Sequence, residues 1–356
     1  MEKNKTYFLK KFFLTPLSWV WSFFYYFRRV CYDYGVFRQR SFQVPVISVG
    51  NLTFGGTGKT PFTLWLSEYL HSKNKRVMVL MRGYKGKLEN SSGLIHSGKK
   101  INPDAGDYGD EALLFARRLE DATIVVGKKR SENLSFYFPK VEPDVVLLDD
   151  GHQHIKLKRK LNIVLFDALM PLWRYKVAPL GYMREGFQAL KDADLIVIGR
   201  ADLAKGERIQ ALKNLLLPHL PAGIPFAEVG FRPNGFYNSS YDLVYTLDQI
   251  RNRKVICVAG VANPQSFFKL LEDLGAEILV TESFPDHHFF KLDEINALLA
   301  YAKSEDALIV TTEKDIVRIK KIVSDESIVF LEVDIHFLSG EMETKEVIDS
   351  CFKNIY

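Results

Sequence analysis

The sequence has few cysteines, no apolar run long enough to span a membrane and no broad excess of charge, and each shortage excludes a class of protein. Its 356 residues include three cysteines, which lie far apart at Cys31, Cys257 and Cys351 with no CxxC pair. This usage is typical of a reducing compartment and excludes a disulfide framework and a cysteine-based zinc site. With 47% hydrophobic and 26% charged residues, the chain is globular and long enough for two packed domains.

A basic face of the kind that binds nucleic acid is also lacking. The formal net charge is +5, but residues 1–40 carry eight Lys/Arg against Glu2 and Asp33, a net charge of +6, and the remainder is close to neutral. The same forty residues hold 14 of the 46 aromatic residues. We therefore expect no nucleic-acid partner, and no obligate protein partner is evident. The body is near neutral and follows a basic, aromatic N-terminal segment.

The N-terminal segment contains the uncharged run FFLTPLSWVWSFFYYF, sixteen residues between flanking cations. A spanning helix needs about 20 apolar residues, and no small-residue cleavage site of a secretory signal follows the run. Trp and Tyr favour the headgroup zone, and flanking Lys/Arg are drawn to anionic lipids. We predict that residues 1–40 form an amphipathic helix that lies in the inner leaflet of a membrane, on the cytoplasmic side, as a peripheral, monotopic element. The alternative is a helix packed on the body of the protein.

Short, continuous β-branched runs then alternate with helical stretches, a pattern typical of an α/β protein whose parallel strands are buried on both faces. The predicted strands are 44–49, 76–81, 123–126, 144–148, 162–166, 194–198, 254–259, 277–281, 307–311 and 327–331. The predicted helices are 59–73, 110–120, 130–138, 205–216, 264–274, 291–303 and 314–323.

Two stretches interrupt this alternation. Residues 84–106 are rich in Gly, Lys, Ser and Asn and favour an exposed loop. Residues 220–250 contain turn formers and alternating apolar positions, so we interpret them as a linker with short strands. The sequence therefore predicts one α/β domain at 41–225 and a second, smaller α/β domain at 226–356.

The strongest local motif is VPVISVGNLTFGGTGKTPF, in which a predicted strand, a glycine-rich turn and a helix follow one another. Glycines let successive backbone N–H groups converge on phosphate oxygens, while Lys59 can reach the β- and γ-phosphates and Thr60 can bind Mg²⁺. Thr53 stands where the common P-loop pattern has glycine, so this is a variant loop. The predicted nucleotide-binding residues are Gly55, Gly56, Thr57, Gly58, Lys59 and Thr60.

A pair of carboxylates, Asp149 and Asp150, follows the predicted strand 144–148. Carboxylates at the end of a neighbouring strand can hold Mg²⁺ beside a bound nucleotide, and one of them can assist proton transfer. The alternative is that the pair only caps the loop. A GTPase is excluded, because the guanine motif N-K-x-D is missing and DDGHQH lacks the D-x-x-G spacing.

Four further polar clusters stand out: YGDEALL, DDGHQH, APLGYMREG and FPDHHFF. In the first, Asp110 and Glu111 begin a helix, and such carboxylates are often only favourable partners of the helix dipole. In the second, two histidines beside two aspartates could hold a metal, although their spacing matches no specific zinc pattern. The residues alone leave these alternatives open.

Together these clusters resemble the tetraacyldisaccharide 4'-kinase family, the lipid A 4'-kinases of the Gram-negative envelope. GNLTFGGTGKTP, YGDE, DDGHQH, LGYMRE, AGVANPQSF, FPDHHF and TTEKDIVR occur in the order that the family shows, over nearly the whole chain. The resemblance implies transfer of the γ-phosphoryl group of ATP, with Mg²⁺, onto the 4'-hydroxyl of a tetraacyldisaccharide 1-phosphate. The product would be lipid IVA. The family also lacks a glycine at the position of Thr53.

The resemblance also implies roles for single residues. The P-loop lysine and threonine fall on Lys59 and Thr60, and the Walker B acids on Asp149 and Asp150. The catalytic aspartate of the family falls on Asp110, which becomes the candidate general base in place of a helix cap. The positions implied to contact substrate or phosphate are Glu111, Arg130, His154, Arg184 and Glu185.

The partner implied for Asp110 is His287, although His288 follows it directly. Because His287 lies beyond the predicted domain boundary, we expect closure of a β-stranded hinge to bring it to Asp110. His152 departs from the bulky apolar or aromatic residue that many relatives carry there, with little expected effect. A membrane-tethered P-loop ATPase or nucleotide switch without a lipid acceptor, and a nucleotide-gated scaffold without turnover, remain alternatives.

Overall fold

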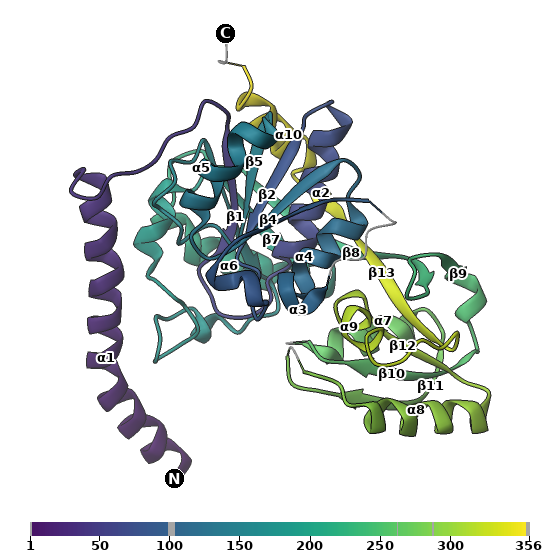
Figure 1. The fold of residues 1–356 in the computed structure, drawn as a ribbon. Coiled ribbons are helices and arrows are strands. Elements are labelled where there is room, and N and C mark those ends of the chain that lie inside the picture. The colour runs from purple at the N-terminus through teal and green to yellow at the C-terminus, as the bar shows by residue number, and fades with distance from the viewer. Residues whose placement is uncertain (1, 99–103, 262, 287, 354–356) are drawn as a thin grey trace. The chain divides into compact units, whose positions relative to one another are not determined.

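The computed structural model describes residues 2–98, 104–261, 263–286 and 288–353, without the side chains of residues 2–12 and 105. Its helices are α1 Glu2–Asp33, α2 Lys59–Ser72, α3 Ala105–Tyr108, α4 Asp110–Arg118, α5 Arg130–Val141, α6 Gly206–Leu216, α7 Pro264–Asp273, α8 Leu292–Glu305, α9 Glu313–Ile319 and α10 Glu341–Ser350. Its strands are β1 Val46–Asn51, β2 Val77–Met81, β3 Gly93–His96, β4 Ala122–Val126, β5 Val145–Asp149, β6 Leu161–Asp167, β7 Leu195–Gly199, β8 Phe226–Tyr237, β9 Leu243–Tyr245, β10 Lys254–Ala259, β11 Glu277–Ser283, β12 Leu308–Thr312 and β13 Ile328–Ser339 (Figure 1).

The α/β class with a mostly parallel sheet is confirmed, and the chain divides into two compact units. One unit comprises residues 1–81, 134–230 and 335–356, and the other comprises residues 82–133 and 231–334. The chain passes from one unit to the other four times: after β2, within α5, within β8 and within β13. Both units are therefore built from segments that are distant in the sequence. The division into domains at residue 225 stays a prediction.

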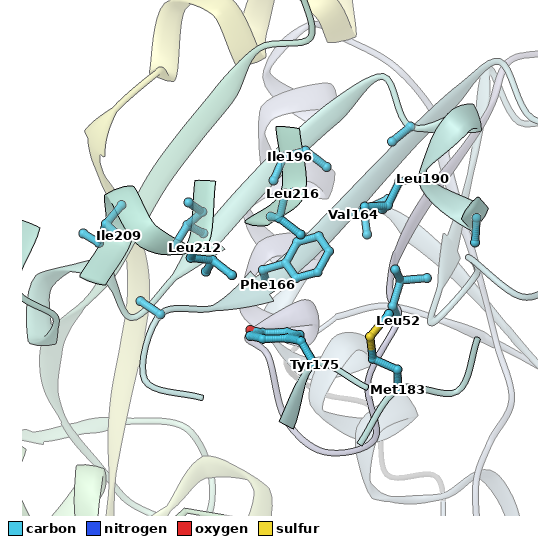
Figure 2. Packing of buried hydrophobic residues seen from close by; sticks show 14 of the residues in the cluster. Leu52, Val164, Phe166, Tyr175, Met183, Leu190, Ile196, Ile209, Leu212 and Leu216 are labelled. Atoms are coloured by element: carbon cyan, nitrogen blue, oxygen red, sulfur yellow. The ribbon is translucent and has the colours of Figure 1, made fainter. Parts of the chain in front are cut away.

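In the first unit, parallel strands run in the order β8-β7-β6-β1-β5-β2. Every residue of β1, β5, β6 and β7 is buried, which explains their continuous apolar sequences. A core cluster on this sheet includes Phe166, Ile198 and Leu212, and it also holds Leu52 and Met183 (Figure 2). Since Leu52 directly follows β1, this core fixes the start of the glycine-rich turn.

In the second unit, β11-β10-β12-β13 are parallel neighbours, β8 follows β13, and β9 pairs with β8 in the antiparallel sense. Helix α7 contacts β10 and β11, and α8 contacts β10 and β12. A core of residues such as Val255, Phe268 and Val329 lies between α7 and the sheet. The antiparallel pair β3–β4 and the helices α4 and α9, which contact each other, belong to the same unit.

Two expectations about irregular segments need correction. Residues 84–106 are not simply an exposed loop, because they contain a short 3-10 turn at Lys87–Asn90 and the half-buried strand β3. The strands in residues 220–250 are not all short, because β8 is twelve residues long. Its sequence contains Pro233 and Gly235, which normally mark a turn. Part of the first stretch, residues 99–103, lies outside the described residues.

Helix α1 contacts the rest of the protein on one side and is exposed on the other. Ser18 and Trp21 donate hydrogen bonds to the backbone oxygens of Val177 and Arg184 at 2.9 and 2.8 Å. Trp19 and Phe24, by contrast, are 70% and 63% exposed. Among the described residues, no helix combines the length and the apolar character that crossing a membrane requires.

A charge cluster around Arg118 lies in the second unit. The Arg118 guanidinium donates to Glu313 at 3.1 Å and also contacts Glu332 and Asp334. Burial raises the pKa of Glu313 to about 7, because the charge of Arg118 does not fully offset the loss of hydration. The folded protein therefore keeps a proton on Glu313 that the unfolded chain releases near pH 4.5.

We expect the stability of the Glu313→Gln variant to increase relative to that of wild type as pH rises. The stability that the raised pKa confers is present below about pH 4.5 and is lost as pH rises through 7. A shift of this size corresponds to about 3 kcal/mol, so the free energy of unfolding of the variant should gain about 2–3 kcal/mol on wild type between pH 5 and pH 8. Urea unfolding at both pH values measures this. The control is Glu326→Gln, which changes an exposed side chain. The expectation is contradicted if the difference in unfolding free energy between Glu313→Gln and wild type is as independent of pH as that for Glu326→Gln.

Candidate active site

The glycine-rich turn joins the end of β1 to the start of α2. Gly58, the residue before α2, has φ 85° and Gly55 has φ +99°, left-handed conformations that favour glycine. The first turn of α2 carries no acidic residue, and no side chain caps it. Its backbone N–H groups and the helix dipole are therefore available to an anion.

The turn also contains a buried hydroxyl. Thr57 is 3% exposed, and within the described parts of the chain its Oγ1 has no hydrogen-bond partner. Gly55 and Gly56 lie at the open part of the turn, where an added Cβ would meet nothing within 4 Å. Thr60 lies in the first turn of α2 and is half-buried. This combination suits an oxygen-rich ligand such as a polyphosphate.

Parallel pairing of β1 and β5 brings the two aspartates to the turn. Val49 is the register partner of Asp149, and the N–H of Gly151 donates to the oxygen of Val49 at 3.0 Å. Asp149 is buried and accepts a hydrogen bond from Thr63 of α2 at 3.2 Å. Asp150 adopts a left-handed conformation with φ 49°. The two carboxylates thus lie where a cation bound to phosphate oxygens would need them.

Asp150 lies between two cations. Its carboxylate is 3.6 Å from the Nζ of Lys59 and accepts bonds of 2.9 and 3.0 Å from Nη1 of Arg184. The segment that carries Arg184 is tied to the turn, because the N–H of Arg184 donates to the oxygen of Leu52 at 2.6 Å. Three of the predicted site residues therefore meet at one point. The oxygen donors of Asp149, Asp150 and Thr60 are of the kind that Mg²⁺ prefers.

A close approach supports this arrangement. A Cβ on Gly50 would lie 2.6 Å from both Cβ and the backbone N of His152, so only glycine fits there. His152 is buried, and burial followed by the charge of Arg29 lowers its pKa to about 3, which keeps the ring neutral. The N–H of His154 donates to the oxygen of Gly151 at 2.8 Å and closes the turn after β5.

Among the described residues, no group of three or more His, Cys, Asp or Glu side chains could hold a metal ion, so the zinc alternative for DDGHQH gains no support.

Glu185 lies next to Arg184 but is buried, and it accepts hydrogen bonds from Arg29 of α1 at 2.7 and 3.1 Å. Burial alone would raise the pKa of Glu185, but the hydrogen bond and charge of Arg29 outweigh this effect and hold the pKa below its usual value. Gln153 donates to Glu185 at 3.0 Å and accepts a bond from Arg184 at 3.2 Å. Glu185 is therefore ionised and connected to the Asp150 cluster.

The other predicted acids lie in the second unit. Asp110 is the first residue of α4, whose preceding residue is Gly109 with φ 87°, so the Asp110 side chain is not the helix cap. Its Oδ2 accepts a hydrogen bond of 2.6 Å from Nε of Arg318. Arg318 also donates to the buried Asp315 at 3.1 Å. The carboxylate of Asp110 is thus fixed by a guanidinium from α9.

Glu111 belongs to the same cluster. Nζ of Lys314 lies 3.2 Å from Glu111 and 3.8 Å from Asp286. The segments YGDE, FPDHH and TTEKD therefore meet in this unit, although they are far apart in the sequence. Arg130, also predicted, begins α5 and is 6% exposed. His287 lies outside the described residues.

Three residues with contacts to predicted site residues were not themselves predicted from the sequence: Arg318, Lys314 and Arg29. The first two lie in the motif TTEKDIVR, directly after a buried strand, and cations at such a position could have drawn attention. Arg29 offered no such signal, because it is one of eight Lys/Arg in the N-terminal segment.

Comparison with known proteins gives a consistent result. The family model described as tetraacyldisaccharide-1-P 4'-kinase (LpxK) matches residues 10–353. The tetraacyldisaccharide 4'-kinase of Halothermothrix orenii is 31% identical over 350 residues, which cover 95% of this chain and 90% of the relative. That of Geobacter metallireducens is 35% identical over 307 residues, covering 86% and 88%.

The fold agrees with the sequence match. The crystal structure of LpxK from Aquifex aeolicus in complex with ATP superposes with a TM-score of 0.77 at 29% sequence identity, over 95% of this chain and 98% of that one. A family model that spans nearly the whole chain, relatives above 30% identity and a common fold lead to one conclusion. The chain belongs to the tetraacyldisaccharide-1-P 4'-kinase family.

Proposed function

We propose that the protein transfers the γ-phosphoryl group of ATP to the 4'-hydroxyl of a tetraacylated glucosamine disaccharide 1-phosphate, which gives lipid IVA in lipid A biosynthesis. The observation that carries this proposal is the meeting of Lys59, Asp150 and Arg184 beside an uncapped helix N-terminus. Family membership supplies the acceptor, and the ATP complex of the Aquifex aeolicus relative supports the donor.

On this proposal, the phosphate loop binds the nucleotide through Gly55, Gly56, Thr57 and Gly58, while Lys59 neutralises charge on the β- and γ-phosphates. Phosphoryl transfer needs little covalent assistance, so alignment and charge neutralisation supply most of the rate enhancement. Thr60, Asp149 and Asp150 would hold Mg²⁺, which neutralises the phosphate oxygens when it is bound. Arg184 keeps Asp150 in place.

The acceptor hydroxyl must lose a proton as it attacks, and we assign Asp110 as the general base. Its hydrogen bond to Arg318 supports this role, because the bond fixes the orientation of the carboxylate. Glu111, Arg130, His154 and Glu185 are proposed to support binding of substrate or phosphate. His287 is proposed to orient Asp110, with His288 as the alternative partner.

An assay with and without acceptor tests the function. Full-length protein with Mg·ATP labelled at the γ-phosphate should transfer label to a detergent-dispersed tetraacyldisaccharide 1-phosphate, and omission of Mg²⁺ should abolish the transfer. If ATP is hydrolysed equally fast with and without acceptor and no lipid is labelled, the result would instead favour the ATPase or switch. Binding of ATP without turnover would favour the scaffold.

We further propose that α1 docks on the cytoplasmic face of the inner membrane and keeps the site beside an acceptor embedded in the leaflet. The exposed aromatic and aliphatic side chains of α1 support this, since so large an apolar surface is unusual on a protein that contacts only water. They are Phe13, Leu17, Trp19, Val20, Trp21, Phe23, Phe24, Tyr26 and Phe27.

Removing two of these side chains should weaken membrane binding. We expect the double variant Trp19→Ser/Phe24→Ser to bind vesicles of phosphatidylglycerol and phosphatidylethanolamine at least tenfold more weakly, because each inserted aromatic contributes about 1.5–3 kcal/mol. Sedimentation with vesicles measures the bound fraction. Phe136→Ser, which removes an aromatic side chain on α5 that is 57% exposed, is the matched control. Equal binding by both variants would exclude α1 as the docking element.

A further inference from the structure

Among the N-terminal cations whose side chains the structure describes, Arg29 is unusual because it is buried. Its neighbour Phe27 is 53% exposed, whereas Arg29 is 4% exposed. Burial of a guanidinium is costly unless charged partners satisfy its donors. A membrane-docking helix has no need of such a residue for lipid contact, so Arg29 serves a different purpose.

The partners of Arg29 account for all three of its nitrogen donors. Nε and Nη2 bind the two oxygens of Glu185 at 2.7 and 3.1 Å, and Nη1 binds Asp192 at 3.0 Å. Nη2 also lies 3.2 Å from Nε2 of His152, whose neutral ring can accept a hydrogen bond. This fork-to-carboxylate geometry is specific to arginine and cannot be reproduced by lysine.

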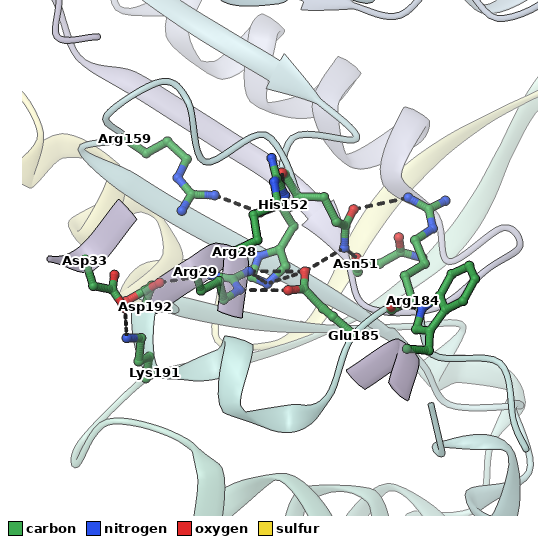
Figure 3. A network of polar contacts seen from close by, with 12 residues as sticks. Arg28, Arg29, Asp33, Asn51, His152, Arg159, Arg184, Glu185, Lys191 and Asp192 are labelled. Carbon is green, nitrogen blue, oxygen red and sulfur yellow. Dashed lines mark hydrogen bonds and ion pairs between the residues drawn. The ribbon is translucent and has the colours of Figure 1, made fainter. Parts of the chain in front are cut away.

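Figure 3 shows the contacts around Arg29, Glu185 and Arg184. From Arg184 the contacts continue to the phosphate loop. Gln153 donates to Glu185 at 3.0 Å and accepts from Arg184 at 3.2 Å. Arg184 in turn holds Asp150, which lies 3.6 Å from Lys59. Each step joins a side chain to the next by a hydrogen bond or an ion pair.

A second contact from α1 reaches the same segment. The indole N–H of Trp21 donates to the backbone oxygen of Arg184 at 2.8 Å. Residues 184 and 185 are thus held by α1 through both the backbone and a side chain. Arg28 also donates a hydrogen bond to the backbone oxygen of Gln153 at 3.0 Å. An ion pair at the end of α1, between Asp33 and Lys191 at 2.5 Å, is exposed and does not touch Glu185 or Arg184.

We propose that Arg29 is a positioning residue for phosphoryl transfer: by fixing Glu185 it orients Gln153 and Arg184 and thereby Asp150, so that the docking helix and the phosphate site act as one unit. This inference rests on the proposed function. It implies that α1 contributes to the chemistry as well as to membrane recruitment. The acceptor need not be in a membrane for the loss of Arg29 to reduce the rate.

The test uses full-length Arg29→Gln and Arg29→Lys. Loss of an outer residue that orients a binding group typically costs 10–100-fold. We expect Arg29→Gln to raise the Kd of Mg·ATP about five- to tenfold by calorimetry and to lower kcat 10–100-fold with detergent-dispersed acceptor. KM for the acceptor should stay within threefold. Arg29→Lys should recover only part of the loss, because lysine keeps the charge without the fork.

Asp33→Asn is the matched control, because it breaks the ion pair between Asp33 and Lys191 and removes none of the contacts of Arg29. Its Kd and kcat should stay within twofold of wild type. If Asp33→Asn reproduces the loss, or if folded Arg29→Gln matches wild type, Arg29 only anchors the helix. Should Arg29→Gln fail to fold, an unchanged Kd for Arg29→Lys overturns the proposal. The Kd needs no acceptor, so it remains informative even if wild type transfers no phosphate to lipid.

Discussion

Replacing Lys59 with alanine should lower kcat about a thousandfold. Lys59 opens α2 directly after the glycine-rich turn and lies 3.6 Å from Asp150, so its charge is held at the phosphate loop. In the proposed mechanism this charge stabilises the γ-phosphoryl group most strongly in the transition state, and removal of one such preorganised donor typically costs 10²–10³-fold. Initial rates of label transfer at saturating Mg·ATP and acceptor measure the loss.

Two variants show whether the loss is specific. Lys59→Arg keeps the charge but replaces a compact ammonium by a planar fork, so it should restore nucleotide binding better than turnover. Lys73→Ala removes a lysine at the other end of α2, where it is half-exposed and pairs with Asp349, and should leave kcat within twofold. A comparable loss for Lys73→Ala would mean that the stability of α2 explains the result.

The phosphate loop could be predicted from the sequence because its information is local. Strand, turn and helix follow one another within about twenty residues. The acids Asp149 and Asp150 are likewise local, because they stand at the end of strand β5. The continuous apolar runs also predicted ten strands of the structure. Strand β3 has only four residues among Gly and Ser, and β8 contains Pro233, so the composition of both strands indicates turns.

The contacts that complete the site could not be predicted, because they join distant segments. Arg29 and Glu185 are 156 positions apart, and Asp110 and Arg318 are 208 apart. No motif with a regular spacing marks either pair in the sequence, because such residues are brought together by the order of the strands in the folded sheet. The family resemblance pointed to Asp110 as a candidate catalytic residue. Only the structure showed that Arg318 donates a hydrogen bond to it.

Asp110→Asn should lower kcat about a thousandfold while leaving the Kd of Mg·ATP within twofold. The amide has nearly the same shape as the carboxylate but cannot accept the proton of the acceptor hydroxyl, and general-base catalysis contributes about 10²–10⁴-fold. Asp107→Asn is the matched control, since Asp107 lies three residues away and pairs with the exposed Lys87. It should retain wild-type turnover. A Kd that rises in parallel with the loss of kcat would assign Asp110 to nucleotide binding instead.

The contact with Arg318 allows a sharper test of the same role. If Arg318 acts by holding Asp110, as their 2.6 Å hydrogen bond indicates, Arg318→Gln alone should reduce kcat about tenfold. The double variant Asp110→Asn/Arg318→Gln should then be no slower than Asp110→Asn, because there is no longer a base to orient. Fully additive losses would show that the two residues act independently. In that case the guanidinium would have its own contact with substrate, and α9 would contribute to the site directly rather than through α4.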